Sequence, residues 1–127
     1  MPKKTIIIKF DINGFNKKAQ SSSVQKTAEF LSEYYELIAA ESANLNWRFI
    51  KTIGDCVLVS ADENNSHEVI NRVHKNIQNV FSINTCYREC EYEELNTTFG
   101  DYSCRDTIGK DINGLFLGDE NTVSISS

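Results

Sequence analysis

Two aspartates stand beside short apolar runs that predict β-strands. Asp11 follows the run at 6–10, and Asp55 stands between the apolar runs at 47–53 and 56–60. A single carboxylate binds a divalent ion weakly, but two that converge on one spot can hold Mg²⁺ or Mn²⁺ against phosphate oxygens. The pair therefore indicates a site for phosphoryl-transfer chemistry, provided that the fold brings Asp11 to Asp55.

The hydrophobic pattern predicts elements in the order βαββαβ. The predicted strands span residues 5–10, 47–53, 56–60 and 87–97, and the predicted helices span about 24–43 and 65–81. This order is typical of an α+β fold, a ferredoxin-like palm with both helices on one face of the sheet. A short C-terminal helix and strand are expected to follow the palm. In that fold the first strand and the central hairpin are neighbours, so Asp11 and Asp55 are expected to lie together.

Length and charge narrow the classes of protein. With 127 residues, of which 40% are hydrophobic, the chain is expected to form one domain over residues 1–127. The formal charge of -5 argues against a nucleic-acid partner bound through a broad basic surface. Without a signal peptide or an apolar run of membrane-spanning length, we expect a cytoplasmic protein with no membrane partner.

Three strings resemble the conserved blocks of class III nucleotide cyclase catalytic domains, the adenylyl and guanylyl cyclase homology domain. Residues 10–15 read FDINGF, similar to the family's F-x-D-I-x-G-F, and residues 51–55 read KTIGD, as in the family's hairpin. Residues 106–113 read DTIGKDIN, which fits D-x-x-G-x-x-V-N with one change from Val to Ile. The resemblance covers about residues 5–126 and is loose between residues 81 and 102.

The resemblance implies an enzyme, a phosphorus–oxygen lyase that converts a nucleoside triphosphate to a 3′,5′-cyclic monophosphate and pyrophosphate. It also implies a homodimer with each site shared between two subunits. Asp11 and Asp55 would hold two Mg²⁺ or Mn²⁺ ions per site, with help from the Ile12 carbonyl.

The remaining site residues come from the same resemblance. The backbone of a short turn would bind the phosphates, and this turn consists of Asn13, Gly14, Phe15 and Asn16. Lys51 and Asp106 match the positions that read the base, and Asn113 matches the catalytic asparagine that positions the ribose. Lys51 and Asn113 also have structural interpretations, as a solvent-exposed strand residue and a local hydrogen-bonding residue.

Two departures from the family pattern concern positive charge. An arginine follows the asparagine by four residues in active members, but Leu117 stands here. The family's phosphate-binding lysine lies beyond the last residue of this sequence. Either another cation substitutes, with Arg105, Lys110 and Lys17 as the candidates, or turnover is poor.

Two other functions stay open on this sequence. A catalytically weak or inactive cyclase homologue would bind a nucleotide or a partner as a regulator, and Leu117 favours this interpretation. A palm-type nucleotidyltransferase would make a cyclic dinucleotide or related signal, but Cys56 after Asp55 fits that pattern poorly.

His67 and His74 lie on the second predicted helix, with no carboxylate to complete a metal motif. Both are expected to face solvent.

Overall fold

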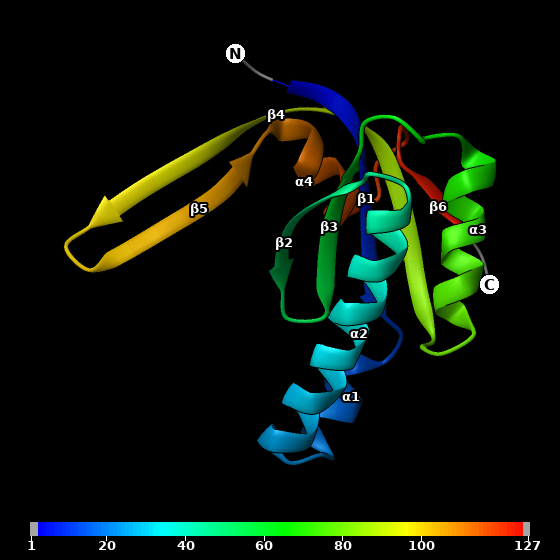
Figure 1. The fold of residues 1–127 in the computed structure, drawn as a ribbon, viewed down its shortest axis with the longest axis vertical. Coiled ribbons are helices and arrows are strands. Elements are labelled where there is room, and N and C mark those ends of the chain that lie inside the picture. The colour runs from blue at the N-terminus through cyan, green and yellow to red at the C-terminus, as the bar shows by residue number, and fades with distance from the viewer. Residues whose placement is uncertain (1–2, 126–127) are drawn as a thin grey trace.

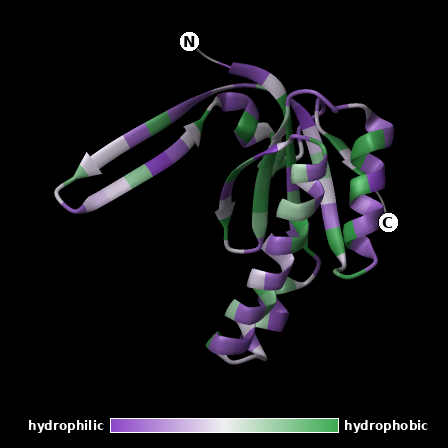
Figure 2. Ribbon diagram, viewed as in Figure 1, coloured by the Kyte–Doolittle hydropathy of each residue, from purple (hydrophilic) through white to green (hydrophobic). Residues whose placement is uncertain are grey.

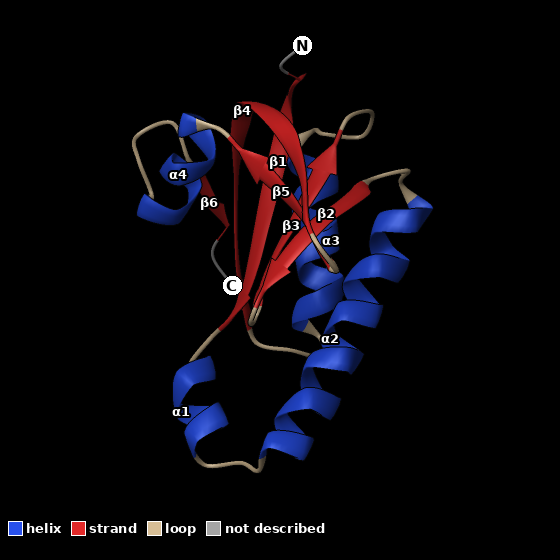
Figure 3. Ribbon diagram, turned by 90° about the vertical axis from the view of Figure 1, so that its left-hand side faces the viewer, coloured by secondary structure: helices blue, strands red, loops and turns tan. Residues whose placement is uncertain are grey.

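The computed structural model describes residues 3–125, which form a six-stranded antiparallel sheet with helices on both faces (Figures 1 and 3). The strands are β1 (Lys3–Ile12), β2 (Arg48–Ile53), β3 (Cys56–Ala61), β4 (Ile83–Phe99), β5 (Tyr102–Ile108) and β6 (Val123–Ile125). The helices are α1 (Phe15–Gln20), α2 (Val24–Asn44), α3 (His67–Gln78) and α4 (Lys110–Leu117).

The sheet has the order β2-β3-β1-β4-β5, and β6 pairs with the first part of β4. Strand β1 lies in the middle, antiparallel to both β3 and β4. Strand β4 pairs along residues 3–12 and β3 along residues 6–10, which places the carboxyl end of β1 beside the β2–β3 turn. The predicted α+β palm with a short C-terminal helix and strand is confirmed.

Each face of the sheet covers its own hydrophobic cluster. Ile8 and Phe10 point toward α2 and α3, whereas Ile7 packs with Leu58 and with Leu115 of α4. The consecutive isoleucines of β1 are thus explained by burial on both faces, as in strands covered by helices on either side. Figure 2 shows the hydrophobic residues concentrated on the central strands.

Local sequence signals set the ends of the elements. The Ser23 hydroxyl accepts the Lys26 N–H at the start of α2, and the Ser66 hydroxyl accepts the Val69 N–H at the start of α3. Gly54 adopts a φ of 59° in the β2–β3 turn, a conformation that L side chains rarely adopt.

Strands β4 and β5 leave the body of the molecule as a two-stranded ribbon (Figure 1). An ion-pair network holds its base: Glu94 accepts hydrogen bonds from Arg48 of β2 and from Arg105 of β5. Arg48 also donates to the Tyr92 hydroxyl at 2.8 Å. The ribbon is therefore fixed in direction where it leaves the sheet.

The sequence pattern located most of these elements, but it missed α1 and the full ribbon. The predicted strand at 87–97 is part of the longer β4, and β5 follows it as a separate strand after a turn at Gly100. Polar residues on both strands of the ribbon hide the alternating pattern that reveals a half-buried strand. Within the described residues, no helix is long and apolar enough to cross a membrane.

His74 is buried, so the expectation that it faces solvent is wrong. Its ring is only 1% exposed, Nδ1 lies 2.7 Å from the Thr85 hydroxyl, and Nε2 has no hydrogen-bond partner among the described residues. Burial, followed by the charge of Lys75, lowers the pKa of His74. His67 is exposed as expected, with Nδ1 2.6 Å from the Tyr87 hydroxyl.

This burial predicts a stability that depends on pH. The unfolded chain takes up a proton on His74 near its ordinary pKa of about 6.5, more readily than the folded chain does. The free energy of unfolding should therefore fall as the pH drops below about 6.5, by at most about 1.4 kcal/mol per pH unit for this group. Urea unfolding of His74→Gln between pH 5 and 8 should show a smaller dependence than wild type.

His67→Gln serves as the matched control and should keep the dependence of the parent. If His74→Gln retains it in full, another group is responsible.

Candidate active site

A hydrogen bond joins the two predicted metal-binding segments. The Ile12 N–H donates to Oδ2 of Asp55 over 3.0 Å, so the β2–β3 turn is attached to the end of β1. The Tyr35 hydroxyl of α2 donates to the Gly54 carbonyl and holds the turn from the other side. The predicted meeting of the Asp11 and Asp55 segments is therefore observed.

Asp11 itself is bound by two neighbours on the sheet. Lys9 Nζ lies 3.1 Å from Oδ2, and the Asn84 side-chain amide donates to Oδ1 over 3.2 Å. Burial by itself lowers the pKa of Lys9, but the hydrogen bond and charge of Asp11 outweigh it, and the net shift is upward. Lys9 is thus an ammonium ion paired with Asp11.

The two carboxylates line two different cavities. Asp55 lines a cavity of about 360 Å³ with Ile12 and residues 14–17. Asp11 lines another, of about 290 Å³, with Lys9, Asn84 and the end of α4. The two cavities share no lining residue.

Of the predicted phosphate-binding turn at residues 13–16, residues 14–16 line the cavity at Asp55, and so does Lys17. Gly14 caps α1 with a φ of 67°, and Phe15, Asn16 and Lys17 share its cavity with Asp55. The first N–H groups of a helix have no partner within that helix and can bind anions. The Asn13 N–H donates instead to the Ser82 carbonyl at 2.9 Å, so its amide is already engaged.

Lys51 and Asp106 form a salt bridge where the ribbon crosses β2. The hydrogen bond from Lys51, followed by that from the Thr107 N–H, lowers the pKa of Asp106. Neither residue lines the cavity at Asp11 or that at Asp55. The predicted site residues therefore form two groups within one chain.

Asn113 is exposed on α4, and the residue four positions later carries no positive charge. Leu117 is 83% exposed at the position of the family's arginine. Arg105 is paired with Glu94 at 3.4 Å. Of the three substitute cations, only Lys17 lines a cavity with either metal-binding aspartate.

The donor set fits a hard divalent ion that arrives with phosphate. No group of three or more His, Cys, Asp or Glu side chains within the described residues could hold a metal ion by itself. Two carboxylates and the Ile12 carbonyl are oxygen ligands of the kind that Mg²⁺ prefers. Substrate phosphates would have to complete the coordination, as in many phosphoryl-transfer sites.

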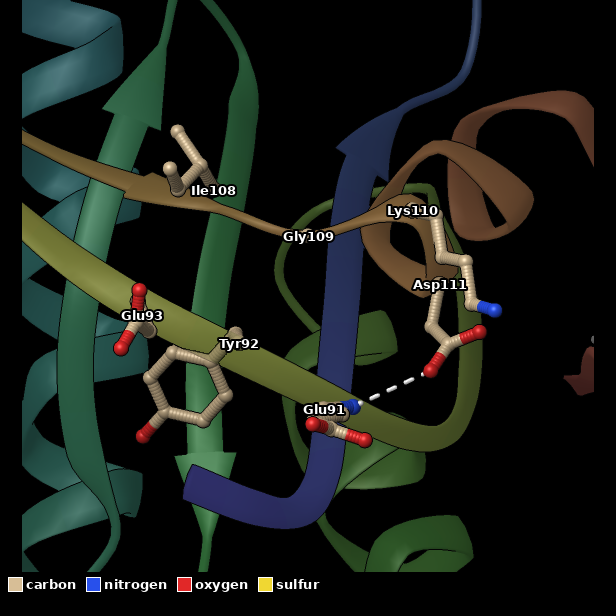
Figure 4. A pocket seen from close by; sticks show the side chains of 7 residues that line it. All are labelled: Glu91, Tyr92, Glu93, Ile108, Gly109, Lys110 and Asp111. Carbon is tan, nitrogen blue, oxygen red and sulfur yellow. Dashed lines mark hydrogen bonds between the residues drawn. The ribbon is translucent and has the colours of Figure 1, made fainter. Parts of the chain in front are cut away.

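In the third motif, residues 106–113, close packing against β4 explains the glycine at position 109. A Cβ on Gly109 would lie 2.4 Å from the Glu91 carbonyl oxygen of β4. Two residues later, Asp111 accepts the Glu91 N–H at 3.1 Å and pairs with the buried Arg88 at 3.2 Å (Figure 4). These contacts dock α4 on the sheet and so determine where Asn113 lies.

A cavity of about 360 Å³ lies at this junction, lined by Glu91, Tyr92, Glu93, Ile108, Gly109, Lys110 and Asp111 (Figure 4). It shares no lining residue with the cavities at Asp11 and Asp55.

Sequence reasoning missed Lys9 and Asn84. Lys9 could have been found, because residues two apart on a strand share a face, which places Lys9 beside Asp11. Asn84 is opposite Asp11 only through the register of β1 with β4, and no local signal reveals that register.

No protein-family model and no curated protein matches the sequence. Solved structures match it well. The guanylate cyclase domain of RhGC from Catenaria anguillulae, in complex with GTP, has a TM-score of 0.76 and 11% identity over 96% of this chain and 75% of that chain. A bacterial light-regulated adenylyl cyclase has a TM-score of 0.70 and 16% identity over 89% and 67%. The guanylyl cyclase Cya2 has a TM-score of 0.69 and 13% identity over 97% and 72%.

The protein therefore has the fold of class III adenylyl and guanylyl cyclase catalytic domains. At this level of identity the comparison establishes the fold, in agreement with the three sequence strings.

Close packing at Gly109 predicts a large cost for a single methyl group. Gly109→Ala should lower the free energy of unfolding by about 2 kcal/mol, because backbone atoms of β4 must move. Thermal unfolding should show a midpoint lower by several degrees. Lys110→Ala, at the exposed neighbouring position, should leave the midpoint nearly unchanged, and equal midpoints for both variants would contradict the packing argument.

Proposed function

We propose that this protein is a metal-dependent nucleotide cyclase that forms a 3′,5′-cyclic monophosphate and pyrophosphate from a nucleoside triphosphate. The observation that carries the proposal is the hydrogen bond from the Ile12 N–H to Asp55. It brings the two acidic segments together on a fold shared with adenylyl and guanylyl cyclase domains.

In the proposed reaction the ribose 3′-oxygen bonds to the α-phosphorus, its proton passes to solvent water, and the bond from the α-phosphorus to the leaving pyrophosphate breaks. Asp11, Asp55 and the Ile12 carbonyl would hold Mg²⁺ or Mn²⁺, and a bound ion would lower the pKa of the 3′-hydroxyl and offset negative charge on the triphosphate. The N–H groups after Gly14 would bind phosphate oxygens, and Lys17 would supply a positive charge to the same cavity.

The proposal includes a homodimer with shared sites. Within one chain, Lys51 and Asp106 line neither cavity at the aspartates, so they would serve the site of a second copy. The ribbon supports this arrangement, because one of its faces carries Leu95, Phe99, Tyr102 and Ile108, all substantially exposed. A two-stranded ribbon is marginally stable alone, and a second copy would cover this apolar face.

A non-catalytic nucleotide-binding regulator is the second candidate. The exposed Leu117 favours it, since the loss of a transition-state cation costs about 10²-fold or more in rate. Retention of both aspartates favours the enzyme, because a regulator without metal chemistry has no need for the pair.

The test is incubation with ATP, GTP, CTP or UTP and Mn²⁺, followed by chromatography with mass detection. We expect a 3′,5′-cyclic monophosphate, reduced by about a hundredfold or more in Asp55→Ala, because a metal ligand is lost. Glu63→Ala removes the same charge from an exposed position and should leave the product yield unchanged.

Each other result assigns a different function. A cyclic dinucleotide would indicate a palm-type nucleotidyltransferase. Nucleotide binding without any product would indicate the regulator.

Substitutions on the ribbon test the proposed dimer. Leu95→Glu combined with Phe99→Glu should weaken self-association about tenfold or more, because two charges would enter an apolar contact. Sedimentation velocity across a concentration series measures the effect. Val24→Glu, at an exposed valine on α2, should associate like wild type, and a wild-type protein that stays monomeric with nucleotide and Mn²⁺ would refute the shared site.

A further inference from the structure

Lys9 is a charged group in contact with Asp11, a proposed metal ligand, and the proposed chemistry does not use it. Its side chain is only 15% exposed, and its Nζ lies 3.1 Å from Asp11 Oδ2 and 5.3 Å from the centre of the Phe116 ring. An ammonium ion over an aromatic face is attracted to it. The Asp11 carboxylate and the Phe116 ring of α4 therefore both hold the ammonium group of Lys9 in place.

Asp11 has a partner on each oxygen in this conformation. Lys9 is bound to Oδ2, and the Asn84 amide donates to Oδ1. Each oxygen keeps a further lone pair, but the ammonium group of Lys9 places a positive charge beside the position that a metal ion would take.

Asp11 and Asp55 line different cavities in this conformation. Asp11 faces the cavity with Lys9 and the end of α4, whereas Asp55 faces the cavity with Gly14 and Lys17. For both carboxylates to bind the same ion, the Asp11 side chain would have to leave its partners Lys9 and Asn84.

We propose that Lys9 is a built-in counter-ion that competes with divalent metal for Asp11, so that metal binding requires Lys9 to leave the carboxylate. The inference rests on the proposed metal site at Asp11 and Asp55. Like charges repel strongly over a few ångströms in a partly buried site, so Lys9 and the ion exclude each other. The cavity of about 290 Å³ that Lys9 lines gives the ammonium group room to move.

The test measures Mn²⁺ binding without turnover, by calorimetric titration with a non-hydrolysable nucleoside triphosphate analogue present. Lys9→Met keeps the length of the side chain and removes its charge. We expect it to lower the Kd for Mn²⁺ about tenfold or more, because Asp11 loses its competitor. Lys9→Arg keeps the charge and should bind Mn²⁺ as weakly as wild type.

Lys4→Met is the matched control, because it removes one positive charge from an exposed position on the same strand. It should change the Kd less than twofold. A Kd for Lys9→Met within twofold of wild type would overturn the inference.

Asp55→Ala separates this inference from the proposed function. If Asp55→Ala abolishes Mn²⁺ binding while Lys9→Met does not strengthen it, the metal site stands and the role of Lys9 falls. If Asp55→Ala binds Mn²⁺ like wild type, the ion is elsewhere and both proposals fail.

A second measurement uses the unaltered protein, in case the variants do not fold. Saturation with Mg²⁺ and the analogue should shift the NMR signal of the Lys9 ε-methylene group, because the ammonium leaves Asp11 and the Phe116 ring. An unchanged signal at saturation would overturn the inference.

Discussion

The hydrogen bond from the Ile12 N–H to the Asp55 carboxylate is the contact on which the candidate site depends. It links the end of the central strand to the tip of a hairpin, two positions far apart in the chain. A charged acceptor makes such a bond stronger than one between neutral groups. Tyr35 secures the same turn through the Gly54 carbonyl, so both flanks of Asp55 are fixed by contacts with other elements.

The sheet supports this contact by being covered on both faces. Helices α2 and α3 bury one side of β1, and α4 buries the other, so β1 cannot shift its register without exposing isoleucines. Helix α4 is attached by polar contacts as well, because the buried Arg88 pairs with Asp111 at 3.2 Å. The position of Asn113 on α4 therefore follows from burial on this second face of the sheet.

Two acidic residues of the candidate site are paired with lysines within the chain. Asp11 forms an ion pair with Lys9 and Asp106 forms one with Lys51, whereas Asp55 accepts the Ile12 N–H. A triphosphate with its metal ions would bring new charges of both signs, and these internal pairs would then exchange partners. The exposed apolar face of the ribbon offers the contact through which a second copy would contribute its half.

Hydrophobic periodicity and turn residues are local signals, and they predicted the βαββαβ order and the two acidic segments. The proximity of these segments followed from the fold that this order predicts. The sequence placed Lys51 with Asp106 only through family resemblance. Tertiary structure alone decided that His74 is buried, that Asn84 lies opposite Asp11, and that Arg105 is held by Glu94. Each of these depends on strand register or helix docking, which arises from contacts between distant residues. A single residue type cannot encode such contacts, so only the folded chain reveals which charges meet.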